Sequence, residues 1–384
     1  MSYLRSQCHY YPSNHFPHPL EIDTVLYGGA RDWREPFKVL VAGGGTGDAL
    51  VMLAQVLTDA RAPFEITYLD LSTKAREIAE ARIAKRRLKN VTFVTGSLLD
   101  AADHGPFDYI DCCGVLHHMA EPVAGLKALE GALKPGAGLG FMVYAPYGRS
   151  GVYPLQEAFG ALLDGLDPEA KVTKAQKIMG TLPEGHPFRR NPLLADHLRD
   201  ASGFYDLLLH AQDRAFRVDE WLAALDEAGL ALTRWVAPAI YDLSMITEVP
   251  DGMDPVVAMA VAEKLRGTLG KHIGYAQRKG EVTPPLVQTA MSLIPHLDAP
   301  RHELAKAVPA GQTLKMTAQG VGFRLKLPEQ AAAILSRIDG RSRLSEIGQA
   351  SGMDPLGFQS LWQKLHGALL ASGLLRYSGL GQRR

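Results

Sequence analysis

A glycine-rich turn behind a short apolar run constrains the fold of this chain more than any other stretch. Residues 37–49 read FKVLVAGGGTGDA, in which Val39, Leu40 and Val41 are typical of a buried parallel strand. The residues from Ala49 onward have the apolar spacing of a helix. Strand, glycine turn and helix form the layout of a nucleotide-binding βα unit. The turn needs glycines because a backbone without Cβ can bend sharply and let a ligand approach its N–H groups.

The spacing of the glycines distinguishes between nucleotide ligands. A dinucleotide fingerprint, GxGxxG, requires a glycine where this chain has Asp48. The turn instead reads GxGxG, which resembles motif I of the class I S-adenosylmethionine (SAM)-dependent methyltransferases. The resemblance implies that the turn binds SAM through Gly43, Gly44, Gly45, Thr46 and Gly47.

Strand and helix signals alternate after residue 37, which predicts a Rossmann-like α/β fold with a doubly wound sheet. Further strands are expected at 64–69, 91–95, 107–113, 139–144 and 230–236. Asp70 follows the second strand, and Leu71 lies beside it. A carboxylate at this place can accept hydrogen bonds from both ribose hydroxyls of SAM. The same position suits a dinucleotide or a helix cap, so Asp70 alone does not discriminate.

Two later motifs resemble the same family. Residues 107–119 read FDYIDCCGVLHHM, close to the FDxIxxxxVLHHL of its motif IV, and 132–144 read ALKPGAGLGFMVY, similar to its LKPGG turn and next strand. The resemblance implies that Cys113 and Gly114 meet the cofactor through their backbone. Where the family often carries an Asp that binds adenine, this chain has Ser97, so the Ser97 hydroxyl and the Leu98 N–H are expected to hold the ring.

One departure from the family lies in the first strand. The family often has an acidic residue where this chain has Val41. The amino group of SAM is therefore held more weakly here or by another group.

The residues after the fourth and fifth strands are candidates for contact with the methyl acceptor. Transfer from a sulfonium needs a general base only where the nucleophile arrives protonated. His117 and His118 are candidates for that base, although His118 can equally shape its loop, and Tyr144 is a third catalytic candidate. Tyr147 and Arg149 follow at the carboxyl edge of the sheet, where they either line the acceptor pocket or pack the loop.

Residues 152–215 interrupt the alternation and are expected to form a helical insertion on the substrate side. Asp206 and His210 are four residues apart and would share one helix face. No third ligand stands in a recognisable pattern, so no metal site is expected. His210 remains a candidate substrate contact, and a surface ion-pair face is the alternative.

The rest of the chain suggests additional modules. Residues 1–36 are expected to cap the first domain or form a lid, 37–245 to be the SAM-binding domain, and 246–320 to be a helical connector. Residues 321–384 resemble a small winged-helix-like domain and are similar to the PqqD-type peptide-recognition domains. DNA binding is disfavoured because the expected third helix carries only Lys364 and His366 as cationic groups. A docking or homodimerisation module is expected instead.

Composition excludes several classes of partner and location. Lys+Arg and Asp+Glu number 41 each, so no net field attracts nucleic acid or an anionic membrane. No apolar run of about eighteen residues predicts a membrane span. The N-terminus lacks an apolar signal core, and three cysteines make no disulfide framework, which favours a cytoplasmic protein.

Together these features predict a SAM-dependent methyltransferase acting on an O or N nucleophile. The acceptor is either a protein or peptide, which the extra domain makes plausible, or a small molecule. The alternative is a catalytically silent SAM-binding regulatory or scaffold protein.

Overall fold

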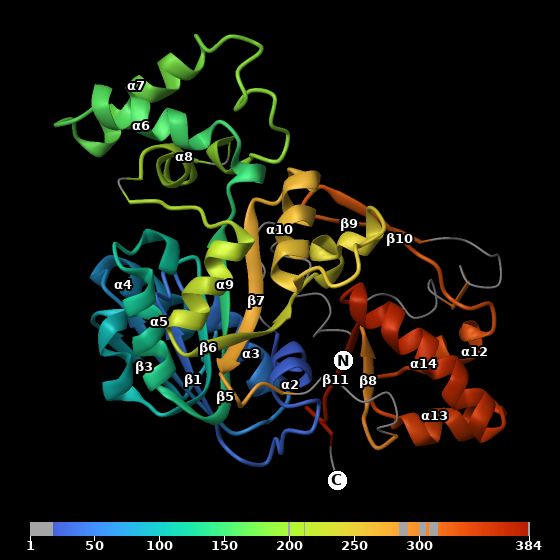
Figure 1. Ribbon diagram of the computed structural model, residues 1–384. Helices are drawn as coiled ribbons and strands as arrows, with labels where there is room; N and C mark the ends of the chain where they lie inside the picture. Colours follow the sequence, from blue (N-terminus) through green and yellow to red (C-terminus); the bar gives the residue numbers. More distant parts are fainter. Residues whose placement is uncertain are drawn as a thin grey trace.

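A seven-stranded sheet forms the centre of the protein, with strand order β3-β2-β1-β4-β5-β7-β6 (Figure 1). The structure is a computed structural model, and it describes residues 18–198, 200–210, 212–283, 291–298, 305–306 and 314–382. The sheet strands are β1 (Phe37–Ala42), β2 (Phe64–Asp70), β3 (Val91–Thr95), β4 (Phe107–Cys113), β5 (Leu133–Tyr144), β6 (Leu230–Trp235) and β7 (Lys271–Arg278). Strands β1 to β5 pair in parallel, whereas β7 runs antiparallel to both β5 and β6.

Helices cover both faces of the sheet, which confirms the predicted Rossmann-like, doubly wound fold. One face packs against α2 (Pro19–Leu26), α3 (Asp48–Asp59) and α4 (Thr73–Lys85). The other packs against η2 (Leu98–His104), α5 (Pro122–Gly131), α9 (Val218–Glu227) and α10 (Pro255–Arg266). Because β1 is covered on both faces, Val39, Leu40 and Val41 are all buried, as a continuous apolar strand requires.

The expectation of a helical connector at 246–320 is wrong for its middle part. Helix α10 does lie there, but 271–278 form β7, which is inserted between β5 and β6 as part of the central sheet. The SAM-binding domain therefore extends beyond the expected limit at residue 245. The sequence does not show the apolar pattern of a buried strand here, because β7 buries two polar residues, His272 and Gln277, both 0% exposed.

The insertion at 152–215 forms a separate lobe, at the top of Figure 1. Its helices are α6 (Val152–Leu162), α7 (Pro168–Met179) and α8 (Ala201–Leu208). They share a small core of their own, which includes Val152, Phe159 and Phe204. The short turn η4 (Tyr147–Arg149) connects β5 to this lobe, and the short turn η3 (Leu116–His118) follows β4.

The C-terminal module begins earlier than residue 321. The expected boundary would divide the hairpin of β9 (Leu314–Ala318) and β10 (Val321–Leu325), and β11 (Leu375–Tyr377) pairs with β8 (Pro295–Leu297). The helices of the module are α12 (Ala331–Leu335), α13 (Leu344–Ser351) and α14 (Pro355–Ala371). Its likeness to winged-helix or PqqD-type domains remains a prediction.

Helix α2 joins this module to the sheet. Glu21 accepts hydrogen bonds from Tyr275 of β7 at 2.6 Å and from Arg376 of β11 at 2.7 Å. The Thr24 hydroxyl donates to the Tyr377 carbonyl at 3.0 Å and accepts from the Tyr377 N–H at 2.7 Å. Residues 18–36 thus pack between two parts of the molecule. The remainder of the expected cap or lid, 1–17, lies outside the described residues.

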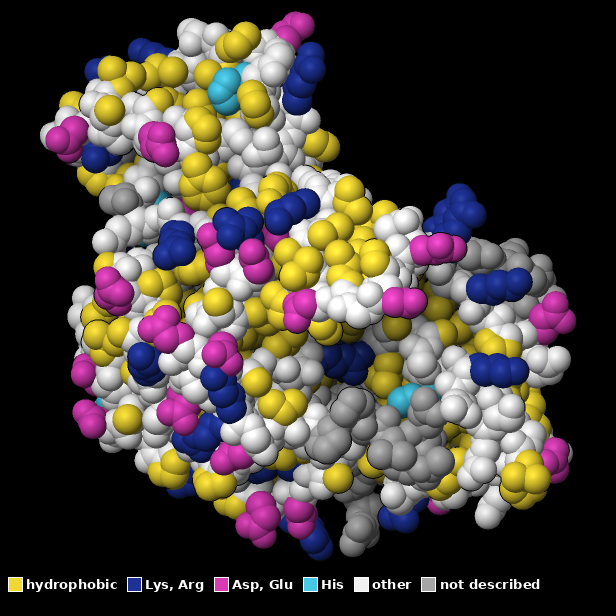
Figure 2. All heavy atoms as spheres, viewed as in Figure 1, with side chains coloured by type: hydrophobic (Ala, Val, Ile, Leu, Met, Phe, Trp, Pro, Cys, Tyr) yellow, Lys and Arg dark blue, Asp and Glu magenta, His cyan; other side chains and the backbone are white. Residues whose placement is uncertain are grey.

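The surface in Figure 2 carries acidic and basic side chains interspersed over the visible face, in line with the zero net charge. Within the described parts of the chain, no helix is long and apolar enough to cross a membrane.

Candidate functional site

The glycine turn between β1 and α3 has the backbone that a ligand-binding loop requires. Gly43, Gly45 and Gly47 have φ angles of +65°, +51° and +88°, in the left-handed region that favours glycine. A Cβ on Gly43 would lie 2.4 Å from Val115, in the loop after β4. The turn therefore packs directly on the loop after β4, while Gly45 faces open space and Thr46 is exposed.

Asp70 is tied to this turn. One carboxylate oxygen accepts the Gly45 N–H at 2.8 Å, and the other accepts the Ser72 N–H at 2.8 Å. The Tyr68 hydroxyl donates to the Gly45 carbonyl at 2.6 Å, so β2 supports the turn at two points. Each Asp70 oxygen keeps a lone pair for another donor. Leu71, 75% exposed, offers an apolar surface beside it.

The two residues expected to contact the adenine, Ser97 and Leu98, also have structural roles. Ser97 is the N-cap of η2, and its hydroxyl accepts the Leu99 N–H at 3.1 Å. The side chain of Leu98 is buried in the core, so only its backbone is available to a ligand. The capped hydroxyl of Ser97 can still donate its proton.

The end of β4 carries no reactive thiol. Gly114 has a φ of +83° and donates its N–H to the Met142 carbonyl at 3.0 Å. The Cys113 thiol lies 3.5 Å from Asp111, and burial together with this carboxylate raises the pKa of Cys113 far above its usual range. Cys113 is therefore a poor nucleophile, and Cys112 is buried in the core on the opposite face.

His117 and His118, although adjacent, differ in environment. His117 is 1% exposed, and neither ring nitrogen has a hydrogen-bond partner among the residues that the structure describes. Burial, and then the neighbouring His118 and Arg149, lower the pKa of His117 to about 2. Such an imidazole is a very weak base, so the expectation of His117 as a general base is not supported. Its ring instead packs on that of Tyr144, with centroids 3.8 Å apart.

His118 lies in a polar cluster shared by the sheet and the insertion lobe. Its ring is 4.1 Å from that of His210, and its Nδ1 is 2.9 Å from the Gln212 carbonyl. The Tyr144 hydroxyl donates to Asp206 at 3.2 Å. Helix α8 ends at Leu208, so Asp206 and His210 do not share a helix face, but the turn after α8 still brings them together.

Arg149 contacts this cluster through the ring of Tyr144. It is 4% exposed, donates to Asp213 at 2.9 Å and to the Tyr153 hydroxyl at 3.1 Å, and stacks on the Tyr144 ring at 3.6 Å. Tyr147 is not brought into the cluster. The charged groups that influence the pKa of Tyr147, after burial, are Glu263 of α10 and a group of residues at the start of α9: Arg217, Asp219 and Glu220.

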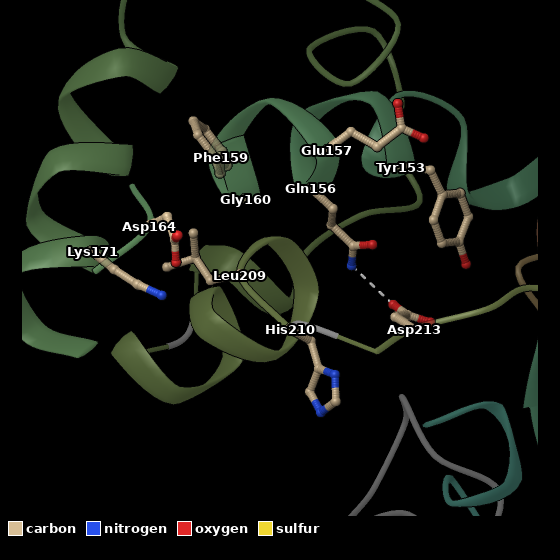
Figure 3. Close-up of a pocket in the computed structure, with 10 residues that line it drawn as sticks. All are labelled: Tyr153, Gln156, Glu157, Phe159, Gly160, Asp164, Lys171, Leu209, His210 and Asp213. Carbon is tan, nitrogen blue, oxygen red and sulfur yellow. Dashed lines mark hydrogen bonds between the residues drawn. The ribbon is translucent and has the colours of Figure 1, made fainter. Parts of the chain in front are cut away.

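Gln156 and Tyr153 are site residues that the sequence reasoning missed. Both contact the Arg149–Asp213 pair, since Gln156 donates to Asp213 at 2.9 Å. Tyr153 and Gln156 are three residues apart on α6, which is the spacing of one helix face. Arg149 lies in η4, before this helix begins, so its spacing to them could not have identified them. Figure 3 shows both on α6, with Gln156 directed at Asp213.

A hollow of about 430 Å³ opens beside this pair in the insertion lobe. Glu157, Asp164 and Lys171 line it, together with His210 and Asp213 (Figure 3). The hollow therefore reaches from the lobe to the polar cluster around His118.

Comparisons with known proteins agree with this geometry. Residues 40–139 match the family model of a methyltransferase domain. An uncharacterized protein of Synechococcus is 33% identical over 201 residues, which cover 50% of this chain and 47% of that protein. A ubiquinone biosynthesis O-methyltransferase of Albidiferax ferrireducens is 27% identical over 93 residues, covering 24% of this chain and 36% of that enzyme. The matched part thus spans less than half the length of either curated relative.

A solved structure shares the architecture over almost the whole chain. It is that of PKMT2 from Rickettsia typhi in complex with AdoHcy, with a TM-score of 0.65 and 16% identity, covering 94% of this chain and 76% of that one. This likeness concerns the fold, and it extends beyond the residues that match the family model. The glycine turn, Asp70 and the β4 motif all lie within residues 40–139, the segment that matches the methyltransferase domain.

Proposed function

We propose that this protein transfers the methyl group of SAM to an oxygen or nitrogen nucleophile, carried by a protein, a peptide or a small molecule. The observation that carries the proposal is the hydrogen bond between Asp70 and the N–H of Gly45. It joins the carboxylate that would receive the ribose to the turn that would receive the methionine end, so that both belong to one binding surface.

The cofactor would be held along the carboxyl edge of β1, β2, β3 and β4. The turn at 43–47 offers backbone N–H groups, Asp70 its remaining lone pairs, and Leu71 an apolar contact. Ser97 and Leu98 would meet the adenine, and the backbone of Cys113 and Gly114 would lie beside the sulfonium. Bound there, SAM supplies an electrophilic methyl group on a good leaving group.

The acceptor would approach from the insertion side. His118, Tyr144 and His210 are placed to orient it, and a protonated acceptor would find its base in His118 rather than in the buried His117. Arg149 acts through Tyr144 as a positioning residue, because the ion pair with fully buried Asp213 fixes the guanidinium under the Tyr144 ring. The C-terminal module is the proposed docking or dimerisation element.

Labelled SAM tests the proposal directly. The purified protein is incubated with labelled SAM and an extract of a strain that lacks it, and label is followed into macromolecules and into small metabolites. Formation of S-adenosylhomocysteine together with a labelled acceptor supports methyl transfer, and the fraction that carries the label separates a protein acceptor from a metabolite. Tight SAM binding without product in any fraction would instead favour the silent regulatory protein.

A further inference from the structure

Three side chains of types that bind metal ions come from distant parts of the chain and converge where the insertion lobe meets the methyltransferase domain. His118 follows β4 in the methyltransferase domain, whereas Asp206 and His210 belong to α8 and the turn after it. One ligand atom from each lies within 4.8 Å of the other two. Ligands about 2.1 Å from a common ion lie at most about 4.2 Å apart, so small side-chain rotations complete the site.

The contacts around the cluster resemble the outer shell of a metal site. The Nδ1 of His118 lies 2.9 Å from the Gln212 carbonyl and donates to it as Nδ1–H, which leaves the lone pair on Nε2 free for a metal. Asp206 receives the Tyr144 hydroxyl on one oxygen at 3.2 Å and keeps the other. Metal-bound histidines and carboxylates are characteristically oriented by such second partners.

His210 needs one adjustment to bind a metal. Its Nδ1 accepts the Gln212 N–H at 3.2 Å, which places the ring proton on Nε2. If His210 binds a metal through Nε2, the ring proton moves to Nδ1. The protonated Nδ1 can no longer accept the Gln212 N–H, so this hydrogen bond is lost. The contact is long for a hydrogen bond, so little is lost in the exchange.

Two imidazoles and one carboxylate favour borderline divalent ions over the hard cations Mg²⁺ and Ca²⁺, which prefer all-oxygen sites. We propose that His118, Asp206 and His210 bind a divalent transition metal, Zn²⁺ or an ion of similar ligand preference, and that this ion clamps the insertion lobe to the methyltransferase domain. Three protein ligands leave at least one position open for a polar group of the acceptor.

The inference adds to the proposed methyl transfer but can be tested apart from it. A metal on Nε2 of His118 occupies the lone pair that this residue would use as a base, so the two roles exclude each other at any one moment. Metal binding is measured without SAM or acceptor. A protein that binds no metal would therefore leave the methyltransferase proposal intact. A protein that transfers no methyl group would likewise leave the metal site intact.

The test is titration of the metal-free, tag-free protein with Zn²⁺ alone by calorimetry, with bound metal counted by mass spectrometry after dialysis. We expect one Zn²⁺ per chain, and at least a tenfold weaker affinity for each of His118→Ala, His210→Ala and Asp206→Asn. His104→Ala is the matched control, because His104 is an exposed histidine in η2, outside the cluster. It should bind Zn²⁺ as the wild type does.

A second measurement addresses the clamp. Zn²⁺ should slow amide exchange in the turn after α8 of the wild type, and should leave it unchanged in Asp206→Asn. Because Asp206 is exposed, this variant should fold as the wild type does, which unfolding in the presence of a chelator will verify. Equal Zn²⁺ binding by the wild type and the three variants, or no bound Zn²⁺ in the wild type, would overturn the proposal.

Discussion

Asp70 is the side chain on which the proposed cofactor site most depends. It holds the glycine turn through the Gly45 N–H and would also receive the ribose hydroxyls, so Asp70→Ala removes both contacts. We expect SAM affinity to fall by about 1–3 kcal/mol, the usual cost of leaving polar groups unpaired. Isothermal titration measures it, with Asp103→Ala, an exposed carboxylate of η2, as the control. Unchanged affinity in Asp70→Ala would contradict the ribose role.

His117 makes the stability of the protein depend on pH. Its pKa is lowered to about 2 in the folded state, against about 6.5 when unfolded, so below pH 6.5 the unfolded chain binds the extra proton and is favoured. The native state should lose about 2 kcal/mol through this group between pH 7 and pH 5. Urea unfolding of the wild type and His117→Phe at both pH values measures the difference. Equal pH dependence of the two proteins would show that His117 is already accessible to protons.

Sequence motifs predict the part of the candidate site that is local in the chain. The glycines, Asp70 and the β4 segment follow from spacing, because each lies where a strand ends and a helix or turn begins. His117 and His118 could not be separated in this way, since the short turn η3 buries one ring and leaves the other accessible. The pair Arg149–Asp213 joins residues 64 apart, and no spacing rule connects an insertion to the loop that it covers.

At the level of elements, apolar strands and amphipathic helices were predictable, while β7 was not. Its polar side chains are buried only because partners elsewhere satisfy them. His272 contacts the Tyr241 hydroxyl and the Phe216 carbonyl, each at 2.8 Å, and Gln277 donates to the Gly136 carbonyl at 3.0 Å. These hydrogen-bond partners are brought to β7 only by the folded structure. In the sequence alone, the polar residues of β7 therefore resemble those of a surface segment.

Helix α2 provides a prediction at this same level. Glu21 pairs with Arg376, and their side chains are 9% and 14% exposed. Glu21→Ala leaves the guanidinium without its main partner in a buried place and removes the acceptor of the Tyr275 hydroxyl. We expect a loss of about 3 kcal/mol in the free energy of unfolding, measured by urea titration.

Asp298 supplies the matched control for this variant. It contacts the same guanidinium at 3.0 Å, but it is 42% exposed, so Asp298→Asn should cost well under 1 kcal/mol. If the two substitutions lower the free energy of unfolding equally, burial is not the reason that the Glu21–Arg376 pair stabilises the protein.

Over the whole molecule, the C-terminal module is expected to be part of one structure with the methyltransferase domain. The fold shared with the Rickettsia protein covers 94% of this chain, and β11 is bonded to α2, which in turn packs on the sheet. Deletion of 321–384 would remove β10 and β11, which leaves β9 and β8 without their partner strands and uncovers α2. We therefore expect the midpoint of thermal unfolding of the remaining chain to fall by about 10 °C, which corresponds to a loss of a few kcal/mol.

Calorimetry of the full chain and the truncated chain measures this fall, and it also shows whether the full chain unfolds in one transition. A substitution that alters only the surface of the module, Leu356→Ser at a side chain that is 78% exposed, should leave the midpoint unchanged. If the truncated chain keeps the midpoint of the full protein, the contacts of α2 with β11 do not stabilise the methyltransferase domain. The module would then be an independent unit, whose function has to be sought in what it binds.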